Sequence, residues 1–74
     1  METLATSPLT MAQRLKFDLA RIAIMTFRTE QQELAATRVR EYVRVGMECI
    51  RHYSIDGFDH ERKAFWQEID RLRR

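Results

Sequence analysis

The chain lacks the disulfide bonds that stabilise many very small proteins. Its single cysteine, Cys49, excludes a disulfide within the chain, and a lone thiol is more typical of a reducing cytoplasm than of a secreted scaffold. One proline and two glycines argue against a loop-rich or disordered chain. No apolar run approaches the roughly 18 residues of a membrane span, and the N-terminus lacks the pattern of a signal peptide. The expected location is therefore cytoplasmic, without membrane association.

Sequence patterns for catalysis and cofactor binding are also absent. There is no Gly-rich phosphate loop, no paired carboxylates and no Ser/His/Asp arrangement. Residues of metal-ligand type cluster late in the chain, namely Cys49, His52, Asp56, Asp59, His60 and Glu61. Their spacing matches no established site, and Cys49 lies on an apolar helix face, where a buried, inert thiol is expected. A chain this short cannot enclose a ligand pocket of several hundred Å3 without losing its core. We therefore expect no enzyme, no cofactor and no metal.

What the chain does have is a dense mixture of charge and apolar residues. Its 74 residues are 45% hydrophobic and 32% charged, which is typical of a folded single domain over 1–74. A chain of this size buries only about 60% of the surface exposed when unfolded, so a partner or oligomerisation is expected to help. The net charge of +2 is a small surplus of 13 basic over 11 acidic groups. Most basic residues are arginine, which favours fork-like pairing with carboxylate or phosphate.

Two long helices are predicted in the first two thirds of the chain. A start signal at Ser7–Pro8 predicts a helix over about 8–27, preceded by a flexible arm at 1–7. A cluster of β-branched residues and a capping-box pattern then predict a break and a second helix over about 30–53. Because the break lacks a glycine, a single helix over 9–53 is the alternative.

A short third helix is predicted after a turn. Asp56-Gly57 suits a turn with positive φ, and Asp59 suits the N-cap of a helix over about 60–73. We expect an all-α protein in which the first two helices form an antiparallel hairpin and the third folds across it. The expected assembly is a dimeric helical bundle.

The predicted first helix is apolar on two sides. One stripe is expected to be core: Met11, Leu15, Leu19, Ile22 and Met25. The other stripe, about 150° away by helical periodicity, is Phe17, Ala20, Ile24 and Phe27. Two short helices can cover one side more readily than both, so the second stripe is expected to meet another chain. The alternative is that the other two helices sandwich the first within a monomer.

The predicted second helix carries a heptad-like apolar seam, which is expected to pack against a neighbouring helix. The seam consists of Ala35, Val39, Tyr42, Gly46, Cys49 and Tyr53. Gly46 costs about 1 kcal/mol relative to alanine inside a helix, so close approach of another helix is expected there. The opposite face is expected to be exposed to solvent and to carry the ion pairs Glu41–Arg44, Arg44–Glu48 and Glu48–Arg51. His52 is expected to pair with Glu48.

The predicted third helix has a narrow apolar stripe that can close a small bundle. The stripe consists of Phe65, Ile69 and Leu72. Trp66 points about 100° away from Phe65, so it belongs either to the core, which is favoured, or to an interface.

Arg14, Arg21 and Arg28 recur every seven residues and form a predicted ridge with about 10.5 Å between its members. They are expected to pair with glutamates of the second helix or of another subunit, or with an acidic partner protein. The signal for nucleic acid is weaker, because Asp18 and Glu30 lie in the same region.

The function expected from these features is binding to protein. We expect a small non-catalytic interaction module, acting as a regulator, inhibitor, adaptor or assembly subunit, that forms a homodimer and binds a partner protein with an acidic surface. The predicted partner-binding residues are Arg14, Phe17, Arg21, Ile24, Phe27 and Arg28. The alternatives are a small nucleic-acid-binding regulator and a non-catalytic subunit of a larger enzyme or particle.

Overall fold

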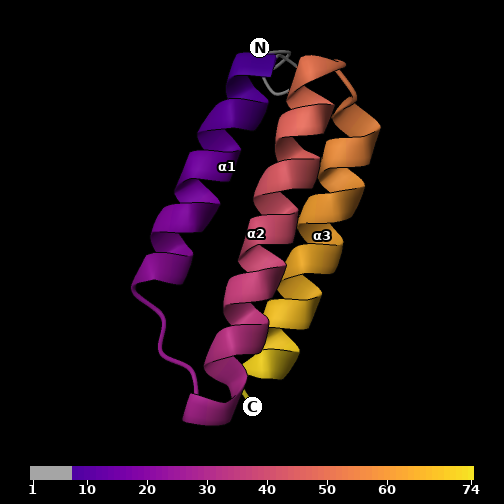
Figure 1. The fold of residues 1–74 in the computed structure, drawn as a ribbon. Helices are drawn as coiled ribbons and strands as arrows, with labels where there is room; N and C mark the ends of the chain where they lie inside the picture. Colours follow the sequence, from indigo (N-terminus) through magenta and orange to yellow (C-terminus); the bar gives the residue numbers. More distant parts are fainter. Residues whose placement is uncertain (1–7) are drawn as a thin grey trace.

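Three helices make up the described part of the chain. The computed structural model describes residues 8–74 as α1 (Pro8–Ala23), α2 (Thr29–Arg51) and α3 (Ile55–Leu72). Figure 1 shows them side by side, with the chain reversing direction at both connections and α1 diverging from α2 towards its C-terminal end. The all-α class is therefore confirmed. The predicted arm at 1–7 lies outside the described residues, and none of these three helices is both long and apolar enough to cross a bilayer.

The connection between α1 and α2 is longer than predicted, because α1 ends at Ala23 rather than near residue 27. The last turn tightens through short-range bonds, in which the Met25 N–H donates to the Ile22 carbonyl at 3.0 Å. Both Met25 and Phe27 then pack against the core from outside the helix. A continued helix would turn Phe27 away from the core, so burial of both side chains accounts for the early end. The alternative of one continuous helix is wrong.

The turn between α2 and α3 comes earlier than the Asp56-Gly57 pattern predicts. Tyr53 takes the left-handed conformation with φ 55°, and the Ser54 N–H donates to the Cys49 carbonyl at 2.8 Å. These are the features of a Schellman motif, which ends a helix by satisfying its last carbonyls. α3 therefore begins at Ile55, so the prediction that Asp59 caps it is wrong. With 18 residues, α3 is also longer than the 16-residue α1, not short.

Gly57 lies in the first turn of α3 for a different reason from the one predicted. No glycine within residues 8–74 has positive φ. Instead, a β-carbon at Gly57 would lie 2.6 Å from the Ser54 hydroxyl oxygen. The absence of a side chain allows the turn to close onto the new helix.

Aromatic rings fill the centre of the core. Tyr42, Phe58 and Phe65 are fully buried, and the rings of Tyr42 and Phe65 stack with centroids 4.1 Å apart. The close approach predicted at Gly46 is confirmed, because a β-carbon there would lie 3.4 Å from the Leu15 methyl groups. The turn pattern at Asp56-Gly57 does not predict a buried Phe58, which lies in the first turn of α3.

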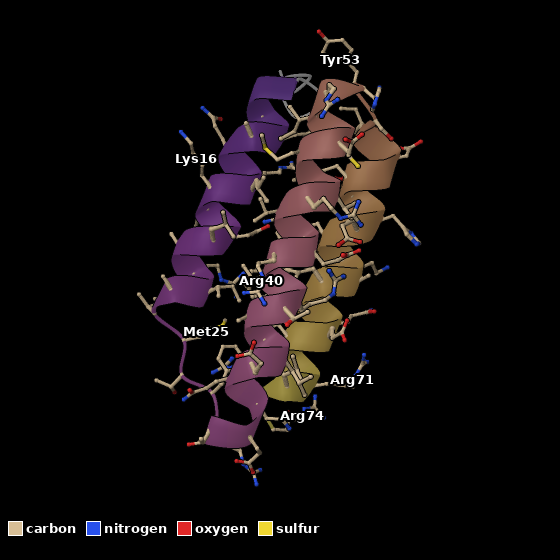
Figure 2. The ribbon with its side chains drawn as sticks, viewed as in Figure 1. Lys16, Met25, Arg40, Tyr53, Arg71 and Arg74 are labelled. Atoms are coloured by element: carbon tan, nitrogen blue, oxygen red, sulfur yellow. The ribbon has the colours of Figure 1, made fainter. Side chains whose placement is uncertain are left out.

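Most of the predicted core positions lie in the core. Those that are buried or packed against it are Met11, Leu15, Leu19, Ile22, Met25, Ala35, Val39, Tyr42, Gly46, Cys49, Phe65, Ile69 and Leu72. Tyr53 is the exception: it is 71% exposed and projects from the end of the bundle (Figure 2). Its position after the end of α2 takes it off the seam.

We predict that Tyr53→Gly stabilises the protein. A non-glycine residue in the left-handed region costs about 1–2 kcal/mol, while the added freedom of glycine in the unfolded chain offsets part of the gain. The expected net gain is about 1 kcal/mol, or roughly 4–8 °C in Tm, measured by thermal unfolding with circular dichroism. Tyr53→Ala is the control, because it keeps the β-carbon. An equal gain in Tyr53→Ala would show that the backbone conformation is not the cause.

Candidate interaction face

The second apolar stripe of α1 is largely uncovered. Phe17 is 57% exposed and Ile24 is 84% exposed, and Ala20 between them is also exposed. The alternative in which the other two helices sandwich α1 is therefore wrong for this stripe. Phe27 does not belong to the exposed stripe, because it lies in the 24–28 connection and its side chain packs against the core.

The three ridge arginines have three different environments. Arg14 lies 3.5 Å from Asp59 of α3. Arg28, outside α1, lies 3.5 Å from Glu30 and donates a hydrogen bond to the main-chain oxygen of Arg74. Arg21 has no acidic partner among residues 8–74. The ridge is therefore not a continuous row of free charge, and only Arg21 keeps its guanidinium available.

Arg21 connects the exposed side of α1 to α3 through aromatic rings. Its guanidinium carbon lies 4.2 Å from the centroid of the Trp66 ring and 6.0 Å from that of Phe17. Cation–π contacts of this kind hold the guanidinium in place while leaving its edge free. Phe17, Arg21, Ile24 and Trp66 are called the interaction face below.

Trp66 belongs to both the core and the surface. Its ring packs edge-on against Phe65, with centroids 5.1 Å apart and an interplanar angle of 69°. Its indole N–H is buried and has no hydrogen-bond acceptor in the described part of the chain. The sequence pattern allowed Trp66 to belong either to the core or to an interface. In the structure its ring contacts Phe65 of the core and also the guanidinium of Arg21.

A buried polar layer, not predicted from the sequence, joins all three helices. The carboxylate of Asp18 is fully buried and accepts two hydrogen bonds from Arg62, at 2.6 and 2.9 Å. The Tyr42 hydroxyl donates to the same carboxylate at 2.6 Å. Burial, followed by this hydrogen bond, raises the pKa of Tyr42 well above its usual range. The hydrogen bond to Asp18 is also the main reason that the pKa of Arg62 is raised.

The sequence does contain a signal for this layer. From α1 into the connection that follows it, the four-and-three spacing of the core side runs Met11, Leu15, Asp18, Ile22 and Met25. On α3 it runs Phe58, Arg62, Phe65, Ile69 and Leu72. A lone acid in one apolar seam and a lone base in another predict a buried pair, provided that the two positions are known to lie at the same level.

A second charged cluster lies between α2 and α3. Arg38 donates to Glu61 at 2.8 Å and to Glu68 at 2.9 Å, and its side chain is 14% exposed. Burial alone would lower the pKa of Arg38, but the two carboxylates raise it overall. This cluster holds α3 against α2, and its one guanidinium and two carboxylates carry a net charge of −1.

The outer face of α2 carries two of the three predicted ion pairs. Arg44 lies 2.9 Å from Glu41, and Glu48 lies 3.2 Å from Arg51 and 3.3 Å from His52, as expected. The third predicted pair, Arg44–Glu48, is not among the ion pairs formed within residues 8–74. Such exposed pairs contribute little to stability individually.

Cys49 and the residues of metal-ligand type show no reactive arrangement. Burial raises the pKa of the Cys49 thiol, and the nearby Glu61 and Glu48 raise it further, so less thiolate forms than in a free cysteine. Across residues 8–74, no three histidine, cysteine, aspartate or glutamate side chains gather around a point that could hold a metal ion.

No protein-family model, curated protein or solved structure matches this chain.

We predict that Arg62→Met strongly destabilises the protein, because it leaves the Asp18 carboxylate buried without its counter-charge. Breaking a buried pair in this way costs about 3–5 kcal/mol, which is comparable with the entire stability expected for a domain of this size. Urea unfolding followed by circular dichroism measures the loss.

The control for this prediction removes the whole polar layer. Asp18→Leu, Tyr42→Phe and Arg62→Met together leave no unpaired group and should recover most of the lost stability, because apolar replacements of buried ion pairs are often neutral or stabilising. A single Arg62→Met variant that unfolds at nearly the parent urea concentration would contradict the proposed importance of the pair.

Proposed function

We propose that this protein is a small non-catalytic interaction module, active in the cytoplasm, that binds a partner protein with an acidic surface through the interaction face. The exposure of Ile24 and Phe17 beside Arg21, which has no acidic partner within residues 8–74, is the observation that carries the proposal. Regulator, inhibitor, adaptor and assembly subunit are all forms of this activity.

The composition of the face is that of a protein-binding surface. Aromatic residues and arginine are enriched at the centres of such interfaces, and tryptophan, tyrosine and arginine carry much of their binding energy. Here Phe17 and Ile24 supply apolar area, while Trp66 holds Arg21 in position. A contact with this face therefore needs little ordering of side chains.

The charges favour an acidic partner. Within residues 8–74, the cations without an acidic partner are Lys16, Arg21, Lys63, Arg71 and Arg73, whereas Asp56 is the acid without a basic partner. An acidic surface would pair with the guanidinium of Arg21 on the face, and the same guanidinium would repel competing basic surfaces.

The same charges give less support to nucleic-acid binding. That function calls for a basic patch or stripe on one face. Lys16 and Arg71 instead project from opposite sides of the bundle (Figure 2). The other arginines within residues 8–74 are paired with acids: Arg14, Arg28, Arg38, Arg40, Arg44, Arg51, Arg62 and Arg74.

We predict that Phe17→Gln abolishes partner capture while the fold is retained. The exposed ring contributes to binding rather than to the core, so a tenfold or greater loss is expected. The measurement is photo-crosslinking in the native cell, followed by mass spectrometry. Met47→Gln is the matched control, because Met47 is 55% exposed on α2, outside the interaction face. Both variants should melt within a few degrees of the parent.

The captured proteins decide between the forms of the proposal. Partners with acidic surfaces that are lost only in Phe17→Gln support it, and their identity separates a regulator from a non-catalytic subunit of a larger enzyme. Equal capture by parent, Phe17→Gln and Met47→Gln would refute the proposed face.

We also predict self-association through the same apolar side chains. Two copies that place Phe17 and Ile24 against each other would cover the stripe that α2 and α3 leave exposed. Sedimentation equilibrium should show a dimer whose population falls in Ile24→Gln. A parent chain that sediments as a monomer at all concentrations would contradict the homodimer and leave the face to a different protein.

A further inference from the structure

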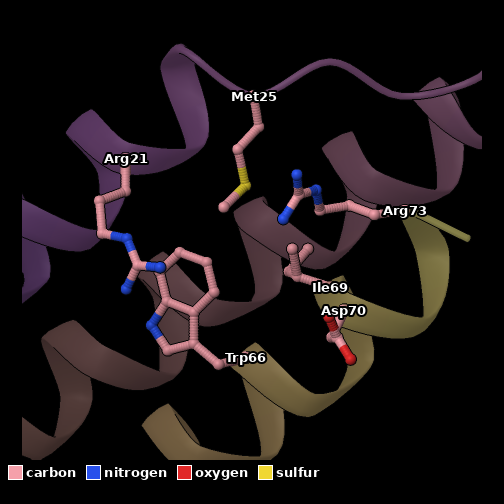
Figure 3. A pocket seen from close by; sticks show the side chains of 6 residues that line it. All are labelled: Arg21, Met25, Trp66, Ile69, Asp70 and Arg73. Atoms are coloured by element: carbon pink, nitrogen blue, oxygen red, sulfur yellow. The ribbon is translucent and has the colours of Figure 1, made fainter.

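A cavity of about 270 Å3 opens between the C-terminal end of α1 and the last turns of α3. Its lining residues are Arg21, Met25, Trp66, Ile69, Asp70 and Arg73 (Figure 3). Because Arg21 and Trp66 belong to both, the cavity adjoins the interaction face.

Two guanidinium groups from different helices border this cavity. In Figure 3, Arg21 and Arg73 extend towards it from two sides. Neither has an acidic partner among the described residues. Arg21 lies over the ring of Trp66, and a guanidinium held in this way keeps its in-plane N–H donors available for a carboxylate.

The net charge of the lining indicates the charge of its ligand. Asp70 also lines the cavity, but its carboxylate lies 2.7 Å from Arg74 outside it. Because Arg74 balances Asp70, the guanidinium groups of Arg21 and Arg73 leave a net charge of +2 beside the cavity, which calls for an anionic ligand.

The size and the walls of the cavity favour a side chain. Pockets for small molecules enclose about 300–1,000 Å3, so this cavity lies just below that range. Met25 and Ile69 give it apolar walls, against which a short methylene stem can pack.

We propose that this cavity receives one glutamate or aspartate side chain of the partner protein. Arg21 and Arg73 pair with its carboxylate, and Met25 and Ile69 contact its stem. This inference rests on the proposed function and adds to it the chemical group that the partner must present.

Trp66 provides a direct test, because it is the single tryptophan of the chain and its indole N–H gives one cross-peak in a ¹⁵N correlation spectrum. The probe is glutamate with an acetylated amine and a methylamide in place of its α-carboxyl group, and the matched neutral probe is the equivalent glutamine compound. The glutamate compound should shift the Trp66 cross-peak saturably in the millimolar range, and the glutamine compound should not.

The arginine variants test the assignment of the site. Arg73→Gln should weaken binding of the glutamate compound about tenfold, since a charge-assisted hydrogen bond is lost. Arg71→Gln is the matched control. Arg71 is also exposed and has no acidic partner within residues 8–74, but it does not line the cavity, so binding should be unchanged.

Four results would overturn the inference: equal shifts with the two compounds, no shift at tens of millimolar, no effect of Arg73→Gln, or tighter binding of the corresponding phosphoserine compound. Because the titration uses no partner protein, its outcome is independent of the capture experiment. Failure of capture with a positive titration would remove the partner proposal and keep a carboxylate site.

Discussion

The arrangement of the helices depends on the hydrogen bonds that the buried carboxylate of Asp18 accepts. It is fully buried, and its bonds come from Tyr42 of α2 and Arg62 of α3, so each helix contributes one member. Apolar seams can slide past one another by a turn at modest cost. A buried carboxylate that loses its counter-charge costs several kcal/mol, so the polar layer disfavours any relative position of the helices that separates Asp18 from Arg62.

That relative position determines which parts of α1 remain exposed. With Asp18 facing inwards, Leu15 reaches Gly46 on one flank of the helix and Arg21 reaches Trp66 on the other. Phe17 lies beyond the reach of α2 and α3 and stays largely exposed. The core meanwhile closes within one chain around Tyr42, so the exposed apolar side chains of α1 are free for binding to another molecule.

The sequence predicted the helices better than their ends. Periodicity placed α2 almost correctly, because its seam is long and regular. It misplaced the end of α1, where Phe27 joins the core from a connection, and the start of α3, where Tyr53 takes the left-handed position expected of Gly57. The first error arises because a tertiary contact, the packing of Phe27 against the core, decided where α1 stops. The second arises because α2 ends in a Schellman motif at Tyr53, where local residue preference favours glycine.

The amino-acid sequence by itself determined the helical class, the two apolar sides of α1 and the abundance of arginine–carboxylate pairing. Each of these follows from residue spacing within one helix. Only the tertiary structure decided that, within residues 8–74, Arg21 has no acidic partner while Arg14 and Arg62 each have one, and that Arg73 and Arg21 line the same cavity. Those outcomes depend on the rotation and level of one helix against another, which the spacing of residues along a single helix does not specify.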